Sequence, residues 1–156
     1  MATNSISVTL TGYDALIKRM NQLPAKIRAK PGRRALGKAA LAVKRQVVQN
    51  VRAIDDPLTG RQIRYNVAQR FRSRYFRSTG DLMISVGVLT NPGRIDPPSN
   101  PDRGARGPTP EWYLYELGTV KQPARPVVTP ALSQAQNAAI AAFTREFQRA
   151  LTDLGV

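Results

Sequence analysis

Twelve prolines determine where regular secondary structure can form in this chain of 156 residues. A proline lacks a backbone N–H and clashes with the preceding turn, so it is expected at the ends of helices and strands rather than inside them. Prolines are densest between residues 91 and 110, where six prolines and three glycines fall within 20 residues. The sequence therefore predicts a single domain over 1–156 that carries a Pro-rich insertion loop at about 91–110.

Three segments between these breaks repeat apolar residues every three or four positions, the pattern of amphipathic helices. The first, 14–27, is interrupted by Pro24, and Pro31-Gly32 separates it from the second, 36–54. Small Ala and Val side chains on the second helix permit close approach to a sheet. The third segment, 132–154, follows Thr129 and Pro130, which we expect to cap and begin a long C-terminal helix.

Four shorter segments have the character of strands. Residues 6–10 alternate apolar and polar side chains, and residues 82–89 are apolar on both faces, as in a central strand. Residues 70–77 place arginines at alternate positions, which favours an extended structure with one exposed basic row. The aromatic segment 112–117 follows the Pro-rich loop. Together these elements predict an α+β fold, a small antiparallel sheet with two or three helices packed on one face and a long C-terminal helix.

The absence of histidine and cysteine excludes most familiar catalytic sites. No Ser-His triad, imidazole zinc site, disulfide or thiolate ligand set is possible. The ten acidic residues are scattered, and the adjacent pair Asp55-Asp56 precedes Pro57, where it is best interpreted as a helix stop. We therefore predict no catalytic, cofactor-binding or metal-binding residues and no enzymatic activity.

The net charge of +14 lies entirely in the first half of the chain. Residues 1–80 hold 17 Lys/Arg and three acids, whereas residues 81–156 hold seven of each. Such asymmetry is typical of a protein with an anionic partner, although a solvated, solubilising face is the alternative. Interleaving of arginines with aromatics also suits a surface that stacks bases, but no RNP motif, GXXG loop or zinc finger accompanies it. The basic positions singled out as a candidate partner interface are Arg70, Arg72 and Arg74.

A second candidate interface lies between residues 113 and 132. Gly118 allows a positive φ, Thr119 can hydrogen-bond the turn backbone, and the prolines that follow stiffen the approach to the last helix. Glu116 and Arg125 could face each other across the turn or across a subunit boundary. A structural corner accounts for these residues better than a ligand site does. The candidate positions are Glu116, Gly118, Thr119, Pro123, Arg125 and Pro126.

This run resembles a family of small structural proteins from long-tailed double-stranded DNA phages, the tail-completion or head–tail neck proteins. The family pattern is an aromatic-rich strand ending in Glu–apolar–Gly–Thr, a short turn, Pro-Ala-Arg-Pro followed by two apolar residues, and x-Pro-Ala-Leu before a C-terminal helix. The opening Ser-Val-Thr-Leu-Thr-Gly–aromatic–Asp-Ala-Leu is similar too. The resemblance covers about 1–56 and 82–153, and the segments 61–77 and 91–110 depart from it.

The resemblance implies a structural virion protein that forms a ring, expected to contain six subunits, and completes the tail tube as a terminator or joins it to the head. Its implied partners are other copies of itself, neighbouring neck and tail-tube proteins, and genomic DNA that passes weakly and non-specifically through the lumen, with no membrane involved. The implied location is the virion neck or tail, after assembly in the host cytoplasm. The alternatives are a basic nucleic-acid-binding domain and a tail-assembly factor absent from the mature particle.

Overall fold

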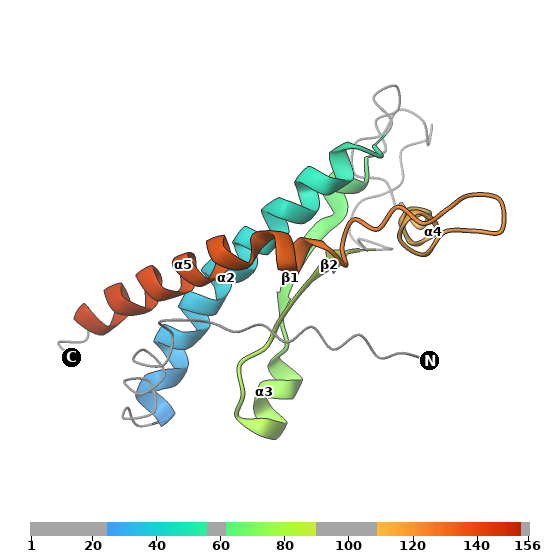
Figure 1. The fold of residues 1–156 in the computed structure, drawn as a ribbon. Coiled ribbons are helices and arrows are strands. Elements are labelled where there is room, and N and C mark those ends of the chain that lie inside the picture. Colours follow the sequence, from blue (N-terminus) through green and yellow to red (C-terminus); the bar gives the residue numbers. More distant parts are fainter. Residues whose placement is uncertain (1–24, 56–61, 90–108, 154–156) are drawn as a thin grey trace.

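The computed structural model describes residues 25–55, 62–89 and 109–153, with four α-helices, a 3-10 turn and two strands in this part of the chain (Figure 1). Their order is α2 (Ala25–Arg52), η1 (Ile63–Asn66), β1 (Val67–Phe71), α3 (Ser73–Thr79), β2 (Ile84–Val88), α4 (Trp112–Leu117) and α5 (Ala131–Thr152). The fold is α+β with a long C-terminal helix, as predicted. The predicted strand 6–10, the first helix as far as residue 24 and the Pro-rich loop up to residue 108 lie outside the described residues.

The predicted break at Pro31-Gly32 is wrong, because α2 continues through both residues. A proline inside a helix costs about 3 kcal/mol or more. Packing offsets this cost, since Pro31 and Gly32 are buried and Ala35, one turn further, is completely buried against α5. A Cβ at position 32 would lie 2.9 Å from Cδ1 of Leu82, so the glycine also leaves room for this side chain.

The two strands form an antiparallel pair in which Val67 lies opposite Val88 and Phe71 opposite Ile84. Because side chains alternate between the faces of a strand, the valines of one face pack toward α2, while Ala68, Arg70, Ser85 and Gly87 occupy the other face. The helices α2 and α5 cross on the first face (Figure 1). This arrangement confirms the prediction of a small antiparallel sheet with helices on one side.

The predicted extended structure of residues 70–77 is correct only as far as Phe71. From Ser73 the chain forms α3, which ends at Gly80 with a left-handed φ of 79° and an N–H bonded to the carbonyl of Phe76. A helix over these residues is basic on most sides, which disfavours packing in a core. It forms here because it needs no such packing, since no residue of α3 is buried and the helix lies at the periphery (Figure 1).

Residues 112–117 form the helix α4, not the strand that was predicted. The helix is short and contributes no fully buried residue, so its aromatic side chains did not reveal which structure they would adopt. The start of the last helix was placed correctly, but Thr129 does not cap it. Pro130 occupies that position, and the Thr129 hydroxyl is bonded elsewhere.

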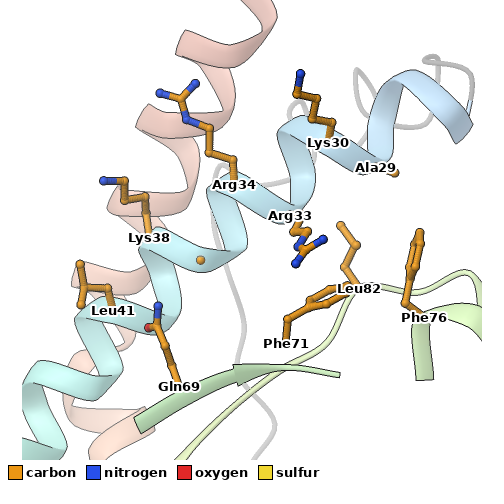
Figure 2. Close-up of a pocket in the computed structure, with 11 residues that line it drawn as sticks. Ala29, Lys30, Arg33, Arg34, Lys38, Leu41, Gln69, Phe71, Phe76 and Leu82 are labelled. Atoms are coloured by element: carbon orange, nitrogen blue, oxygen red, sulfur yellow. The ribbon is translucent and has the colours of Figure 1, made fainter. Parts of the chain in front are cut away.

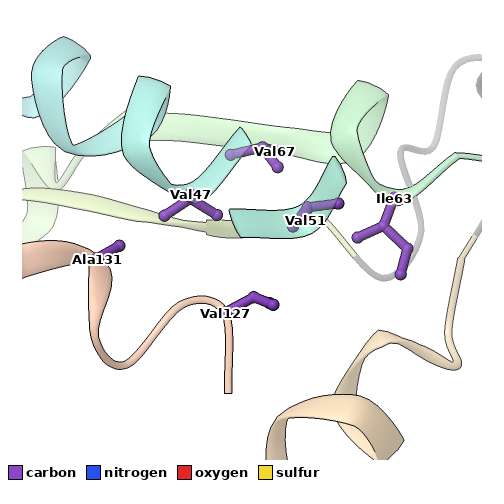
Figure 3. Packing of buried hydrophobic residues seen from close by; sticks show 6 residues of the cluster. All are labelled: Val47, Val51, Ile63, Val67, Val127 and Ala131. Atoms are coloured by element: carbon purple, nitrogen blue, oxygen red, sulfur yellow. The ribbon is translucent and has the colours of Figure 1, made fainter. Parts of the chain in front are cut away.

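Two groups of buried side chains hold the layers together. One lies between α2, β1 and the approach to α5 (Figure 3), and comprises Val47, Val51, Ile63, Val67, Val127 and Ala131. The other joins α2 to the far half of α5, where Ala35 meets Phe143, Phe147 and Leu151. The small residues of α2 therefore serve close helix–helix packing as well as packing on the sheet. Leu132 was predicted to belong to the buried stripe of α5, but its exposed fraction is 65%.

Candidate interaction site at the corner between α4 and α5

Glu116 joins α4 to the chain that leads into α5. Its Oε2 accepts the backbone N–H groups of Val127 at 2.7 Å and Val128 at 2.9 Å. Its Oε1 accepts the N–H of Thr129 at 2.8 Å and the Thr129 hydroxyl at 2.5 Å. One carboxylate thus binds three successive N–H groups just before a helix, which is a favourable place for negative charge.

The electrostatic surroundings of Glu116 reflect this geometry. Partial burial alone would raise the pKa of the carboxyl, but the hydrogen bonds from the Thr129 hydroxyl and from the N–H groups of residues 127–129 outweigh it and hold the pKa below its ordinary value. Glu116 is therefore ionised near neutral pH, and the corner depends on its charge. Arg125 was predicted as a possible partner of Glu116, but among the described residues the two ion pairs both involve Arg34 instead.

Val127 is fixed from three directions. Its N–H is bonded to Glu116, its side chain lies in the buried group shown in Figure 3, and its carbonyl accepts the Asn50 side chain at 2.9 Å. Asn50 also donates to the side chain of Gln134 at 2.8 Å and accepts from Gln46 at 3.0 Å. The corner is thereby attached to α2 as well as to α5. Sequence reasoning missed Asn50, because a polar residue beside an apolar helical stripe gives no sign of a partner 77 positions away.

Gly118 and Thr119 shape the loop that leaves α4. Gly118 has φ 75° and ψ 176°, a conformation that is essentially restricted to glycine, and a Cβ there would lie 2.7 Å from the backbone N of Ala124. The Thr119 hydroxyl accepts the N–H of Gln122 at 3.0 Å, and the Arg125 N–H bonds the carbonyl of Tyr115 at 2.7 Å. The predicted positive φ and the predicted hydroxyl–turn bond are confirmed. The side chains of Pro123, Arg125 and Pro126 are exposed on the same loop.

This loop and α4, residues 112–126, form an arm that projects from the crossed helices (Figure 1). The arm carries four of the nine exposed large hydrophobic residues in the described part of the chain, namely Tyr113, Leu114, Leu117 and Val120. Leu117 is 76% exposed and Val120 is fully exposed. A cluster of apolar side chains held in water by a rigid corner is typical of a protein–protein contact surface.

The structure brings Arg70, Arg72 and Arg74 together, although not as the predicted row along a strand. Arg70 lies in β1, Arg74 lies in α3, and Arg72 links the two, donating to the Ser85 hydroxyl at 2.7 Å. The three arginines line one hollow of about 480 Å³ with Tyr75 and Met83. No carboxylate of the described residues pairs with any of them. This hollow therefore carries uncompensated positive charge, which favours an anionic partner.

A larger hollow of about 730 Å³ lies between the first half of α2 and the aromatic side chains of β1 and α3 (Figure 2). Four basic residues of α2 border it, but Figure 2 shows that Arg33 points toward Phe71 whereas Lys30 and Arg34 point away. The guanidinium of Arg33 lies 4.1 Å from the centre of the Phe71 ring, a cation–π contact. Arg34 pairs with Glu146 on α5. The basic side chains of α2 are therefore divided between two sides of the helix and do not converge on one ligand.

The described residues contain neither a cluster of metal-ligand side chains nor a helix suited to span a membrane. Within 25–55, 62–89 and 109–153, no three potential ligand side chains gather as a metal site would require. In the same ranges, none of the helices combines the length and hydrophobicity needed to cross a bilayer.

Comparisons with protein families, curated proteins and solved structures yield no match for this chain.

Proposed function

We propose that this protein is a structural component of the neck or tail end of a long-tailed double-stranded DNA phage, where it forms a ring that completes the tail tube and joins the tail to the head. The resemblance of residues 113–132 to the tail-completion family supports this proposal. The α+β fold with a long C-terminal helix agrees with it. We also propose that the protein resides in the virion and acts without catalysis.

The arm is the observation that carries the proposal. A protein that works alone gains nothing from holding Leu117 and Val120 in water, since exposed apolar side chains favour association. Here Glu116, Gly118 and Thr119 keep the arm in a fixed position. A subunit that must meet identical neighbours at a defined angle requires such a fixed contact surface.

Phage particles made without this protein test the proposal. We expect unjoined heads and tails, or tails of irregular length, and rescue by the wild-type chain supplied in trans. Gold labelling or cryo-EM of normal particles should place the chain at the head–tail junction. Normal particles assembled in its absence would refute the structural role, and a chain needed for assembly but missing from mature particles would identify an assembly factor.

A second candidate function, nucleic-acid binding, is favoured by the hollow lined by Arg70, Arg72 and Arg74. In a neck ring, this charge would meet an acidic neighbouring protein or the passing genome. Contact with the genome should be salt-sensitive and no tighter than the micromolar range of non-specific binding. Nanomolar, sequence-selective binding of the isolated protein to DNA or RNA would favour the second candidate over the first.

Replacing these three arginines by alanine separates the outcomes. All three side chains are exposed, so the melting temperature should change little. If the hollow docks an acidic protein, heads and tails should fail to join while the fold stays intact. Normal titres with normal tails would exclude the arginines from assembly.

A further inference from the structure

An apolar groove lies near the start of α5. It measures about 300 Å³ and is lined by Leu36 and Val43 of α2, Ile84 and Val86 of β2, Val128, and Leu132 together with alanines of α2 and α5. Every residue that lines it is aliphatic. Because no lining side chain offers a charge or a hydrogen bond, the groove suits aliphatic side chains and not a nucleic acid or a polar ligand.

Leu132 marks the rim of this groove. It belongs to the helical stripe that the sequence marks as buried, yet its exposed fraction is 65%. Within the described residues, the apolar pattern of α5 thus extends beyond the surface that the rest of the structure covers. The same chain displays matching chemistry on the arm, where Leu117 is 76% exposed and Val120 is fully exposed.

We propose that the arm of one subunit inserts Leu117 and Val120 into the apolar groove of a second copy of this chain. The inference deepens the proposed function and rests on it, since it names the contact that builds the ring. The arm cannot easily bend back to its own groove, because the bonds of Glu116 fix α4, and Gly118 and the turn at Thr119 fix the loop after it, which lies apart from α2 and α5 (Figure 1).

The symmetry of the contact follows from the two surfaces. The arm and the groove are different parts of the chain, so each subunit has one of each, and pairing is head-to-tail. Head-to-tail contacts close into a ring when the rotation between neighbours permits it. A single seated arm covers much less than the roughly 800 Å² per partner of a stable pair. We therefore expect weak pairs and a stable closed ring, in which every arm is seated.

Cysteine cross-linking captures such a contact even when it is weak, and the natural chain contains no cysteine to interfere. In the full chain carrying both Val120→Cys and Leu132→Cys, mild oxidation should give a ladder of covalent oligomers beyond the dimer. Chains with one of the two cysteines should stay monomeric when oxidised alone. Mixed in equal amounts, the two single variants should give a disulfide-linked dimer that does not grow.

Matched cysteines one position away provide the control. Lys121→Cys and Ser133→Cys are also exposed but lie outside the groove lining, and their double variant should cross-link at least tenfold more slowly. Dimers of Val120→Cys alone would indicate an arm-to-arm contact and overturn the proposal. Absence of the ladder would also overturn the proposal. If the thiol of Leu132→Cys is then protected from a bulky maleimide as well, another segment of the same chain covers the groove.

The failure of this inference is distinguishable from that of the proposed function. If the junction of phage particles contains a ring but Val120→Asp and Leu132→Asp leave joining normal, the ring is built by other surfaces. If the chain is absent from the junction and dispensable for joining, the proposed function itself fails. Loss of joining in both aspartate variants, with unchanged melting temperatures, is the expected result.

Discussion

The bonds of Glu116 to residues 127–129 are expected to hold the arm in place, and two substitutions test them. Glu116→Ala removes an acceptor that serves three backbone N–H groups and one hydroxyl. Glu116→Gln keeps the size of the side chain but presents an NH₂ group to half of these donors. The alanine variant should therefore lose the whole attachment and the glutamine variant about half of it.

The magnitude follows from the number and exposure of the bonds. A hydrogen bond to a charged group contributes about 1.5–3 kcal/mol when its loss leaves the partner without water. The Val127 N–H belongs to a buried residue, whereas Thr129 is exposed and its donors regain water. We therefore expect a loss of about 2–4 kcal/mol for Glu116→Ala and about 1–2 kcal/mol for Glu116→Gln. For a domain of this length, the larger loss lowers the melting temperature by roughly 4–16 °C.

Chemical denaturation and amide exchange together measure this loss. Exchange of the Val127, Val128 and Thr129 amides should accelerate in both variants, while the amides in the middle of α2 change only by the loss of global stability. If Glu116→Ala leaves these three amides protected at wild-type stability, the bonds of Glu116 do not hold the arm. A glutamine variant less stable than the alanine variant would exclude the assigned acceptor role as well.

The pH dependence of wild-type stability checks the same bonds. Because the folded state holds the pKa of Glu116 below its ordinary value of 4.5, the stabilisation is complete above that value and is lost as the pH falls through the lower, folded pKa. Asp55 contributes to the pH dependence with the opposite sign, since a pKa that is raised in the folded state makes the stability increase as the pH falls. Its burial raises its pKa, although the N–H groups of Ile63 and Arg64 and the Arg64 charge oppose the shift. The Glu116→Gln variant should thus show a smaller loss of stability on acidification than the wild type.

Further substitutions test a glycine conformation and an ion pair. Gly118→Ala should cost about 3 kcal/mol or more in thermal unfolding and displace the arm, because both the backbone conformation and the close approach of Ala124 exclude a side chain. Gly80→Ala is the control. It has a positive φ but open space around it, so it should cost only about 1 kcal/mol in the same measurement. Arg34→Ala should destabilise by about 1–3 kcal/mol in denaturant titration, because it leaves the Glu146 carboxylate buried without its cation, and adding Glu146→Gln should recover most of that loss. Full destabilisation in the double variant would show that Arg34 acts through packing and not through charge.

The sequence by itself determined the long elements of this protein and the local conformation of its turn. The stripes of residues 36–54 and 132–154 extend over several helical turns, so the buried face of each helix outweighs local preferences. The run of aliphatic residues around Ile84–Val88 is likewise sufficient to predict a strand. The glycine at position 118 permits the positive φ found there, since few other residues can occupy that conformation.

Only the tertiary structure decided the short segments and the breaks. Ser73–Thr79 and Trp112–Leu117 contain seven and six residues, too few for intrinsic helix preference to determine their structure. Pro31 should end a helix, yet burial of the adjoining turn against α5 keeps α2 continuous. The bonds of Glu116 were also beyond sequence reasoning. Three of their four donors are backbone N–H groups, which every residue except proline carries, so only the path of the chain after Gly118 determined that residues 127–129 would meet this carboxylate.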